Sequence, residues 1–303
     1  MKKALINTLL SLMEQQDNIY VFTGDLGFGV MAPIIEQYPE RFFNLGICEQ
    51  NMASVAAGMA LSGNIVYIYS IGNFPTFRCM EQIRNDITYH NANVKIIAVG
   101  SGFSYGSLGM SHHLTEDLGA MRALDNLTIL SPCDAEETGE CIKYANNING
   151  PVYIRLGRGG EERTGQTSAK VQDNKVKRIL EGEEKVIFAT GSIVNEVKAA
   201  AERIKGLGGN IGVYSVPVIK PIDLDSVKEI CQKAQNVYTV EEHNVTGGLG
   251  SAVAEILADY NISCTFKRMG IRGYTEIVGS PEYLRKYYKL DAESIINEVL
   301  KED

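Results

Sequence analysis

Short runs of β-branched and aromatic residues alternate with helical patterns along most of this 303-residue sequence. In the first half the strong runs are Ile19–Thr23, Ile65–Tyr69, Val94–Val99, Leu127–Leu130 and Val152–Leu156, and a weaker one is Phe42–Leu45. Strands that are separated by helix-length segments pair in parallel, because the chain must cross back over the sheet between them. The sequence therefore predicts an α/β fold with a doubly wound parallel sheet.

A polar interval divides the chain. From Gly157 to about Glu184 the hydrophobic period is lost, and the interval begins Gly-Arg-Gly-Gly-Glu-Glu-Arg, which is typical of a linker. The alternation then resumes, with strands expected at Val186–Thr190, Gly212–Val216, Val237–Val240 and Cys264–Met269. We predict two doubly wound domains, residues 1–160 and a smaller one at 183–303, joined by a linker at 161–182.

Composition excludes several classes of protein. Lys and Arg number 29 against 37 Asp and Glu, so the net charge is -8, and such a chain lacks the basic stripe that nucleic-acid binding needs. The uncharged stretch from Gln50 to Phe77 is broken by glycines and a proline, which indicates a buried helix and strand and no membrane span. The six cysteines form no CxxC pair and no metal-ligand spacing, so we expect a cytoplasmic protein with no metal site of its own.

Ligands gather at the carboxyl ends of parallel strands, so the segments after each strand are the candidates for a site. Thr23-Gly24-Asp25-Leu26-Gly27 follows the first strand and has the composition of an ordinary turn. Glu49 begins an apolar helix rich in Ala and Gly. There the helix dipole would favour its charge and burial would oppose it, and the sequence leaves that balance open.

Two further segments carry aromatic and histidine side chains. Phe74 and Phe77 precede a helix, and aromatic rings in such a loop either belong to the core or stack on a planar heterocycle. His112 and His113 lie in Gly109–Asp117. Neighbours on an extended segment point opposite ways, so we expect a proton-transfer or hydrogen-bonding role for one histidine in preference to a shared metal.

In this order the segments resemble the C-terminal half of transketolase, and Arg122–Thr128 and Glu241–Gly250 extend the resemblance over nearly the whole chain. The resemblance implies a pyrimidine-binding domain, then a transketolase C-terminal domain, and thiamine diphosphate as cofactor. It implies that Glu49 hydrogen-bonds the ring nitrogen of the aminopyrimidine, that Phe74 stacks on this ring with Phe77 as a neighbouring wall, and that Asp25 lies near the thiazolium.

The resemblance also implies substrate contacts. His112 matches a histidine that contacts the substrate hydroxyl and oxyanion, and Arg158 matches an arginine that reaches the sugar or its phosphate. Three family positions that bind sugar phosphates are changed, to Gly29, Gly100 and Leu108. We therefore expect transfer of a two-carbon ketol unit with an atypical acceptor, such as a modified or nucleotide-linked sugar.

The GDG…N motif that holds the diphosphate and its metal in this family is absent from the sequence. The resemblance therefore implies an N-terminal partner subunit that carries Mg²⁺ or Ca²⁺, in an α2β2 assembly that pairs through the Ala/Gly helix after Glu49. Three alternatives stay open: the β subunit of a 2-oxo acid dehydrogenase E1, a deoxyxylulose-phosphate-synthase-like enzyme, and a non-catalytic assembly subunit. His243 is either a cleft residue or a structural one.

Overall fold

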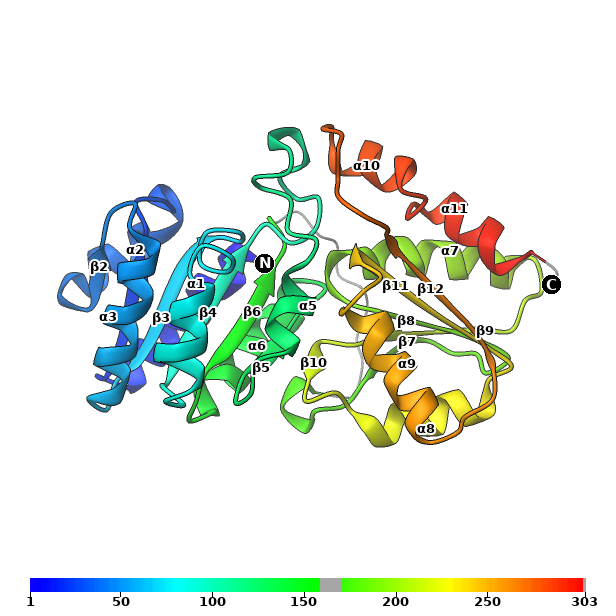
Figure 1. Cartoon of the computed structure of the whole chain (residues 1–303), viewed down its shortest axis with the longest axis horizontal. Coiled ribbons are helices and arrows are strands. Elements are labelled where there is room, and N and C mark those ends of the chain that lie inside the picture. Colours follow the sequence, from blue (N-terminus) through cyan, green and yellow to red (C-terminus); the bar gives the residue numbers. More distant parts are fainter. Residues whose placement is uncertain (159–169, 302–303) are drawn as a thin grey trace.

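The computed structural model describes residues 1–158 and 170–301, which form two α/β domains side by side (Figure 1). The first sheet has seven strands in the order β10-β5-β6-β4-β3-β1-β2. Its strands are β1 (Ile19–Thr23), β2 (Phe42–Asn44), β3 (Ile65–Ile71), β4 (Val94–Val99), β5 (Thr128–Leu130), β6 (Val152–Leu156) and β10 (Val218–Lys220). All of its pairings are parallel except the one between β10 and β5.

Helices cover both faces of this sheet, as a doubly wound fold requires. One face packs against α1 (Lys2–Gln15), α2 (Phe28–Gln37) and α6 (Ala135–Asn147). The other packs against α3 (Glu49–Leu61), α5 (Asp117–Arg122) and a π-helix, η2 (Ile83–Thr88), which follows the short α4 (Met80–Gln82). Short 3₁₀ turns lie at η1 (Pro39–Arg41) and η3 (Gly106–Leu108).

The second sheet has five strands in the order β12-β11-β8-β9-β7. They are β7 (Lys177–Leu180), β8 (Lys185–Ala189), β9 (Ile211–Ser215), β11 (Asn236–Asn244) and β12 (Thr265–Ile271). Around them lie η4 (Val171–Asp173), η5 (Gly191–Ile193), α7 (Val194–Gly206), α8 (Leu224–Lys233), α9 (Leu249–Asp259), α10 (Pro281–Tyr287) and α11 (Ala292–Val299). The prediction of two doubly wound domains is confirmed.

Two strands differ from the sequence-based expectation. β7 lies inside the segment predicted as a linker and pairs antiparallel with β9. The part of that predicted linker up to residue 169 lies outside the described residues. β10, in the second half of the chain, crosses to the first sheet and pairs antiparallel with β5. Neither strand has a hydrophobic period long enough to recognise, and β10 covers the otherwise bare edge of β5.

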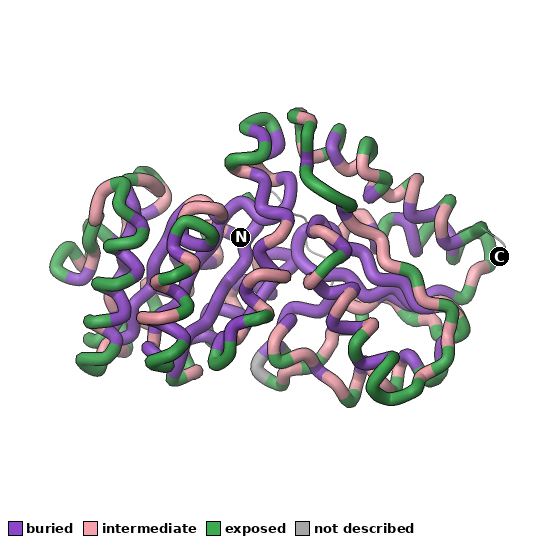
Figure 2. The backbone as a smooth tube through the Cα atoms, in the orientation of Figure 1, coloured by how far each residue is buried: buried purple, intermediate pink, exposed green. Residues whose placement is uncertain are grey.

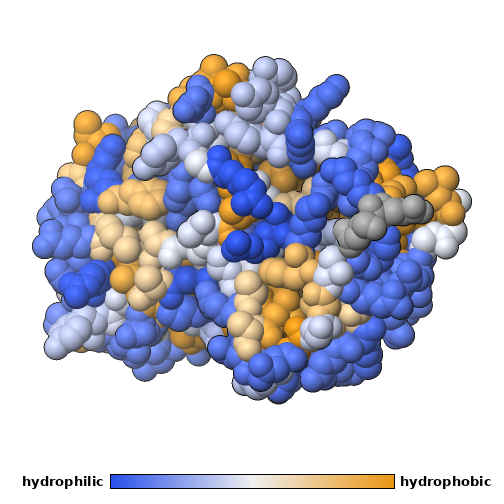
Figure 3. Space-filling model, turned by 45° about the vertical axis from the view of Figure 1, so that its right-hand side comes forward, coloured by the Kyte–Doolittle hydropathy of each residue, from blue (hydrophilic) through white to orange (hydrophobic). Residues whose placement is uncertain are grey.

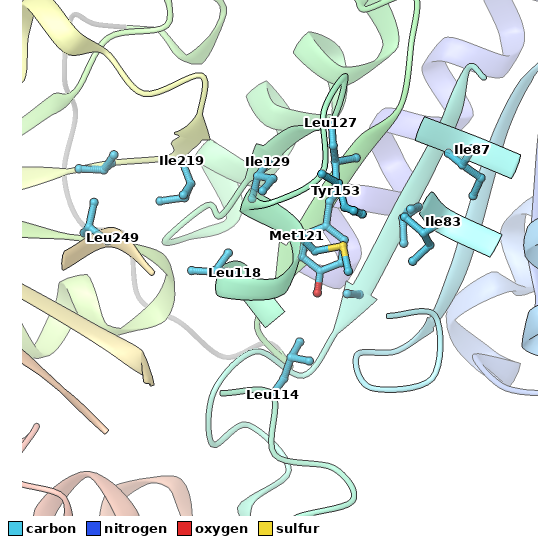
Figure 4. Packing of buried hydrophobic residues seen from close by; sticks show 14 of the residues in the cluster. Ile83, Ile87, Leu114, Leu118, Met121, Leu127, Ile129, Tyr153, Ile219 and Leu249 are labelled. Atoms are coloured by element: carbon cyan, nitrogen blue, oxygen red, sulfur yellow. The ribbon is translucent and has the colours of Figure 1, made fainter. Parts of the chain in front are cut away.

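One hydrophobic cluster extends across both domains, and each domain also has a buried cluster that is mainly its own. Figure 4 shows Ile83, Leu118 and Tyr153 of the first domain in the same buried cluster as Ile219 and Leu249 from the second half of the chain. Figure 2 shows the same continuity as buried backbone that runs through both sheets, while the outer faces of the helices are exposed. The domains therefore meet as a packed interior rather than across a hinge.

A buried ion pair stands at the centre of this interface. Arg155 on β6 donates from Nε to Asp117 Oδ2 at 2.9 Å, and from Nη2 to the carbonyls of Leu114 at 2.7 Å and Glu242 at 2.9 Å. Burial, and then the neighbouring Asp117 carboxylate, raise the pKa of Tyr153, so its hydroxyl stays protonated and donates to Asp117 at 2.9 Å. The charges of Arg155 and Asp117 are thus paired, which burial requires.

The surface seen in Figure 3 is largely hydrophilic, with separate hydrophobic patches. In the described residues no helix has both the length and the apolar character that crossing a membrane demands.

We predict that Asp117→Asn lowers the free energy of unfolding by about 3–5 kcal/mol, because it leaves the Arg155 guanidinium buried without its counter-charge. Urea unfolding of the purified subunit measures the change. As a control, Glu293→Gln breaks an ion pair with Arg203 whose side chains are both more than half exposed, and its cost should stay below about 1 kcal/mol. Equal costs for the two variants would contradict this account of the interface.

Candidate active site

The predicted site residues follow neighbouring strands of the first sheet at their carboxyl ends. Asp25 follows β1, Glu49 follows β2, Phe74 follows β3, His112 lies in the long loop after β4, and Arg158 follows β6. These five strands are contiguous in the sheet, so one edge gathers side chains from distant parts of the chain.

Glu49 is the first residue of α3 and is only 3% exposed. An added Cβ on Gly24 would lie 3.4 Å from Glu49 Cγ, so the turn after β1 packs directly against this side chain. The Glu49 carboxylate accepts a hydrogen bond from Arg78 Nη1 at 2.9 Å, and Arg78 is about half exposed. The position at a helix N-terminus and the arginine both favour a buried carboxylate.

Phe74 lies beside this pair. The Arg78 guanidinium carbon is 4.5 Å from the centre of the Phe74 ring, so one arginine contacts both the carboxylate and the aromatic face. Burial, and then the Glu49 carboxylate, raise the pKa of the nearby Cys79 to about 12. The neutral Cys79 thiol donates to the Phe74 carbonyl at 3.2 Å, which fixes the backbone that carries the ring.

His112 also contacts Phe74. The two ring centres are 5.5 Å apart with an interplanar angle of 72°, an edge-to-face contact. The Asn73 amide donates to the carbonyls of Ser111 at 2.9 Å and His113 at 3.0 Å, so the residue before Phe74 holds the loop on both sides of His112. His112 Nδ1 is 3.0 Å from Ser111 Oγ.

His113 makes contacts away from the site. The expected extended segment is instead a turn, in which the amides of His112 and His113 both donate to the Gly109 carbonyl, so the separation of the two rings does not come from strand alternation. His113 is buried, with Nε2 2.9 Å from the Gly106 carbonyl and Nδ1 2.7 Å from Thr275 Oγ1 in the second domain. A carbonyl accepts only, so Nε2 carries a proton and donates to Gly106. His113 therefore ties the loop that carries His112 to the second domain.

Tyr105 connects His112 with Arg158, and sequence reasoning missed it. Its ring centre is 6.2 Å from that of His112, and the Arg158 guanidinium carbon lies 5.2 Å from it. A Cβ on Gly100, which has φ +101°, would lie 2.2 Å from Tyr105 Cδ2. The absence of a side chain at position 100 is what leaves room for this ring, so Gly100 is the sequence signal that could have indicated it.

Asp25 and Phe77 are the two remaining predicted site residues. Asp25 is exposed and accepts from Asn44 Nδ2 at 3.1 Å, while its own amide donates to Asn44 Oδ1 at 2.9 Å. Phe77 is 40% exposed beside Arg78. The structure thus links Glu49, Phe74, His112 and Arg158 through Arg78 and Tyr105.

His243 is a structural residue of the domain interface. It is fully buried, its Nδ1 donates to the Asn244 carbonyl at 2.6 Å, and its Nε2 accepts from the Gly119 amide at 3.3 Å. Both ring nitrogens are therefore hydrogen-bonded to backbone groups. Of the two interpretations that the sequence left open, these contacts support the structural one.

Each of the two domains matches a known protein family. Residues 1–160 match the family described as the transketolase pyrimidine binding domain, and residues 174–295 match the transketolase C-terminal domain. A Methanocaldococcus jannaschii protein named as a transketolase C-terminal section is 38% identical over 100% of this chain and 96% of its own length. An apulose-4-phosphate transketolase subunit from Actinobacillus succinogenes is 36% identical over 88% of this chain and 86% of its own length.

A solved structure shows the same arrangement. A split gene transketolase, described as an inactive beta4 tetramer, has a TM-score of 0.87 and 34% identity, and the match covers 98% of this chain and 95% of that one. The chain belongs to the transketolase family. Within that family it is the C-terminal subunit of a split transketolase, and the resemblance seen in the sequence is confirmed.

Members of this family depend on thiamine diphosphate, and the described residues fit one end of it. A buried carboxylate beside a half-buried aromatic ring suits a planar nitrogen heterocycle that hydrogen-bonds at its edge and stacks on its face. Arg78 makes both contacts in the subunit alone, so the heterocycle and Arg78 compete for one place. For the diphosphate end, residues 1–158 and 170–301 contain no group of three His, Cys, Asp or Glu suited to a metal.

We predict that Arg78→Met costs the isolated subunit about 1 kcal/mol of unfolding free energy, because the buried Glu49 carboxylate loses its counter-charge. In a Glu49→Gln background the same substitution should cost clearly less, which urea unfolding of the four proteins in a double-mutant cycle tests. The exposed neighbour Arg84, replaced by Met, serves as a control with no dependence on Glu49. Equal costs in both backgrounds would refute the coupling.

Proposed function

We propose that this subunit, joined to an N-terminal subunit, transfers a two-carbon ketol unit between sugars. The observation that carries the proposal is the buried Glu49 carboxylate beside the Phe74 ring, with His112 against the same ring. Membership of the transketolase family supports it. When bound, thiamine diphosphate would supply the carbon nucleophile that carries the ketol unit.

Each residue has a definite task in this proposal. Glu49 exchanges Arg78 for the aminopyrimidine ring nitrogen and holds a proton there, while Phe74 stacks on the ring and Phe77 forms a neighbouring wall. The exposed Asp25 faces the thiazolium side. In its half-buried position His112 donates a hydrogen bond to the substrate hydroxyl or developing oxyanion, where charge appears in the transition state.

Arg158 is assigned to the far end of the sugar. Its guanidinium carbon lies 5.2 Å from the centre of the Tyr105 ring and its side chain is exposed, so it is available to a ligand. Tyr105 fills the space at Gly100, and the changes at Gly29 and Leu108 remove two further polar groups that the resemblance leads one to expect. These changes support an acceptor other than the ordinary pentose phosphates.

The partner would supply the diphosphate site with Mg²⁺ or Ca²⁺ in an α2β2 complex. We assign its docking surface to exposed apolar side chains around the edge strand β2, namely Phe28 on α2, Phe43 on β2, Ile47 before α3 and Val55 on α3. Their exposed fractions are 71%, 42%, 81% and 39%. The occupant is an N-terminal transketolase section, because this surface includes Ile47, two residues before Glu49, and the described residues contain no group of three His, Cys, Asp or Glu suited to a metal.

The alanines of α3 do not form this surface. Ala53, Ala56, Ala57 and Ala60 are buried against the subunit's own sheet, whereas outward residues of α3 such as Val55 and Gly58 are exposed. The expectation that the Ala/Gly helix pairs subunits through its small residues is therefore wrong for the alanines, which the tertiary fold uses internally.

The function is tested by co-expressing the subunit with an N-terminal transketolase section and adding thiamine diphosphate and Mg²⁺. We expect ketol transfer to aldehyde acceptors by the complex and none by either subunit alone. Release of carbon dioxide from pyruvate without ketol transfer would instead indicate a 2-oxo acid dehydrogenase or a deoxyxylulose-phosphate synthase.

We predict that Glu49→Gln lowers kcat of the assembled complex about a thousandfold or more, which corresponds to ~4 kcal/mol of transition-state free energy. The amide retains the shape of the side chain, but unlike a carboxyl group it cannot exchange a proton with the ring nitrogen. Size-exclusion chromatography should show normal assembly, and Glu14→Gln on the exposed face of α1 should keep full activity. Full activity in Glu49→Gln would reject the assigned role.

We predict that Ile47→Glu weakens association with the N-terminal subunit by about tenfold or more, because it places a charge in an apolar contact. Leu207→Glu, at a residue 75% exposed in the second domain, should leave the Kd unchanged. Isothermal titration calorimetry measures both. Similar affinities of the two variants would show that the docking surface does not include Ile47.

A further inference from the structure

A cavity of about 650 Å³ lies between the two domains, beyond Arg158. On the first-domain side it is lined by Ser104 and Ser107 of the loop after β4 and by Arg158. On the second-domain side it is lined by residues around the start of α7 and of α10, among them Ser192. This volume is within the range of small-molecule sites, roughly 300–1,000 Å³.

The cavity lies where a doubly wound sheet is expected to bind ligands. Ser192 lies shortly after the end of β8. The next strand in the chain, β9, pairs with one side of β8, and the later strand β11 pairs with the other side. The carboxyl end of β8 is therefore the point at which the strand order reverses. Ser104 and Arg158 follow β4 and β6, so the ligand-binding edges of both sheets open into one space.

Arg158 is shared by this cavity and the candidate active site. Arg158 lines it and also lies 5.2 Å from the centre of the Tyr105 ring, which in turn is 6.2 Å from His112. A substrate that reacts beside His112 and extends beyond Tyr105 and Arg158 would reach this space. A chain of that length is longer than an ordinary pentose.

The lining groups favour an uncharged, hydroxylated occupant. The hydroxyls of Ser107 and Ser192 form no hydrogen bond with the residues that the structure describes, so they remain available. Arg285 lines the cavity but its charge is taken by Glu242, through a short Nε contact, and by Glu196 at 3.4 Å. Glu196 and Glu282 also line the cavity, so an anionic group on the ligand would have only Arg158 to pair with and would lie near two carboxylates, whereas hydroxyl groups would find several partners.

We propose that this cavity is an acceptor subsite that takes a polyhydroxylated, uncharged extension of the sugar, such as a glycosyl group. The inference rests on the proposed ketol transfer and adds to it the class of acceptor. Ser107 and Ser192 hydrogen-bond the extension from the two domains, and Arg158 marks the passage from the reacting end of the acceptor to its distal end.

The test compares D-ribose with 5-O-glucosyl-D-ribose as acceptors for the assembled complex. The wild type should show kcat/KM at least about tenfold higher for the glucosylated sugar, because only that sugar reaches the cavity. Ala199→Phe should lower this ratio at least about tenfold, mainly through KM, since Ala199 is an exposed helix residue that lines the cavity and the larger ring fills it. Ser107→Ala, a smaller change at an exposed loop residue, should lower the ratio in the same direction.

A matched control is Ala258→Phe, the same substitution at an exposed position of α9 away from the cavity, which should leave the ratio unchanged. If the wild type transfers ketol units equally well to both sugars, or if Ala199→Phe and Ala258→Phe have the same ratio, the subsite is overturned while the proposed function stands. If no acceptor is used at all, the proposed function fails and the subsite with it.

Discussion

The rest of the structure depends on the buried Arg155–Asp117 pair. Arg155 on β6 holds the start of α5 through Asp117, the loop that carries His112 through the Leu114 carbonyl, and the second domain through the Glu242 carbonyl. A guanidinium buried in this way must satisfy its donors, so the three segments have one arrangement in which they meet. The contacts of Arg155 at the domain interface therefore fix the loop that carries His112, and this loop sets the position of His112 in the candidate site.

The second domain acts on the site through this loop. Thr275 hydrogen-bonds His113 at 2.7 Å, and the Gly279 amide donates to the Gly106 carbonyl at 3.2 Å, so the loop is held beside the segment that leads to α10 (Figure 1). Arg78 plays the corresponding part on the other side, where it pairs with Glu49 and covers Phe74. The site in the single subunit is thus ordered but closed by one of its own side chains.

Much of the fold could be predicted because its strands are short apolar runs with recognisable ends. β1, β4 and β6 lie where the alternation places them, and Glu49 begins its helix as expected. β7 and β10 escaped prediction because their pairing depends on edges that only the folded sheets create. Tyr105 escaped for a similar reason: its role follows from the space at Gly100, which neighbouring residues in the chain do not reveal.

The sequence by itself determined the two α/β domains, the order of the motifs and the family, because these follow from local hydrophobic periods and from residues that are close along the chain. Only the tertiary structure decided that His243 is structural, that the alanines of α3 are internal, and that Arg78 contacts both Glu49 and Phe74. Those outcomes depend on which distant segments share a buried volume, and burial forces their polar groups to pair there.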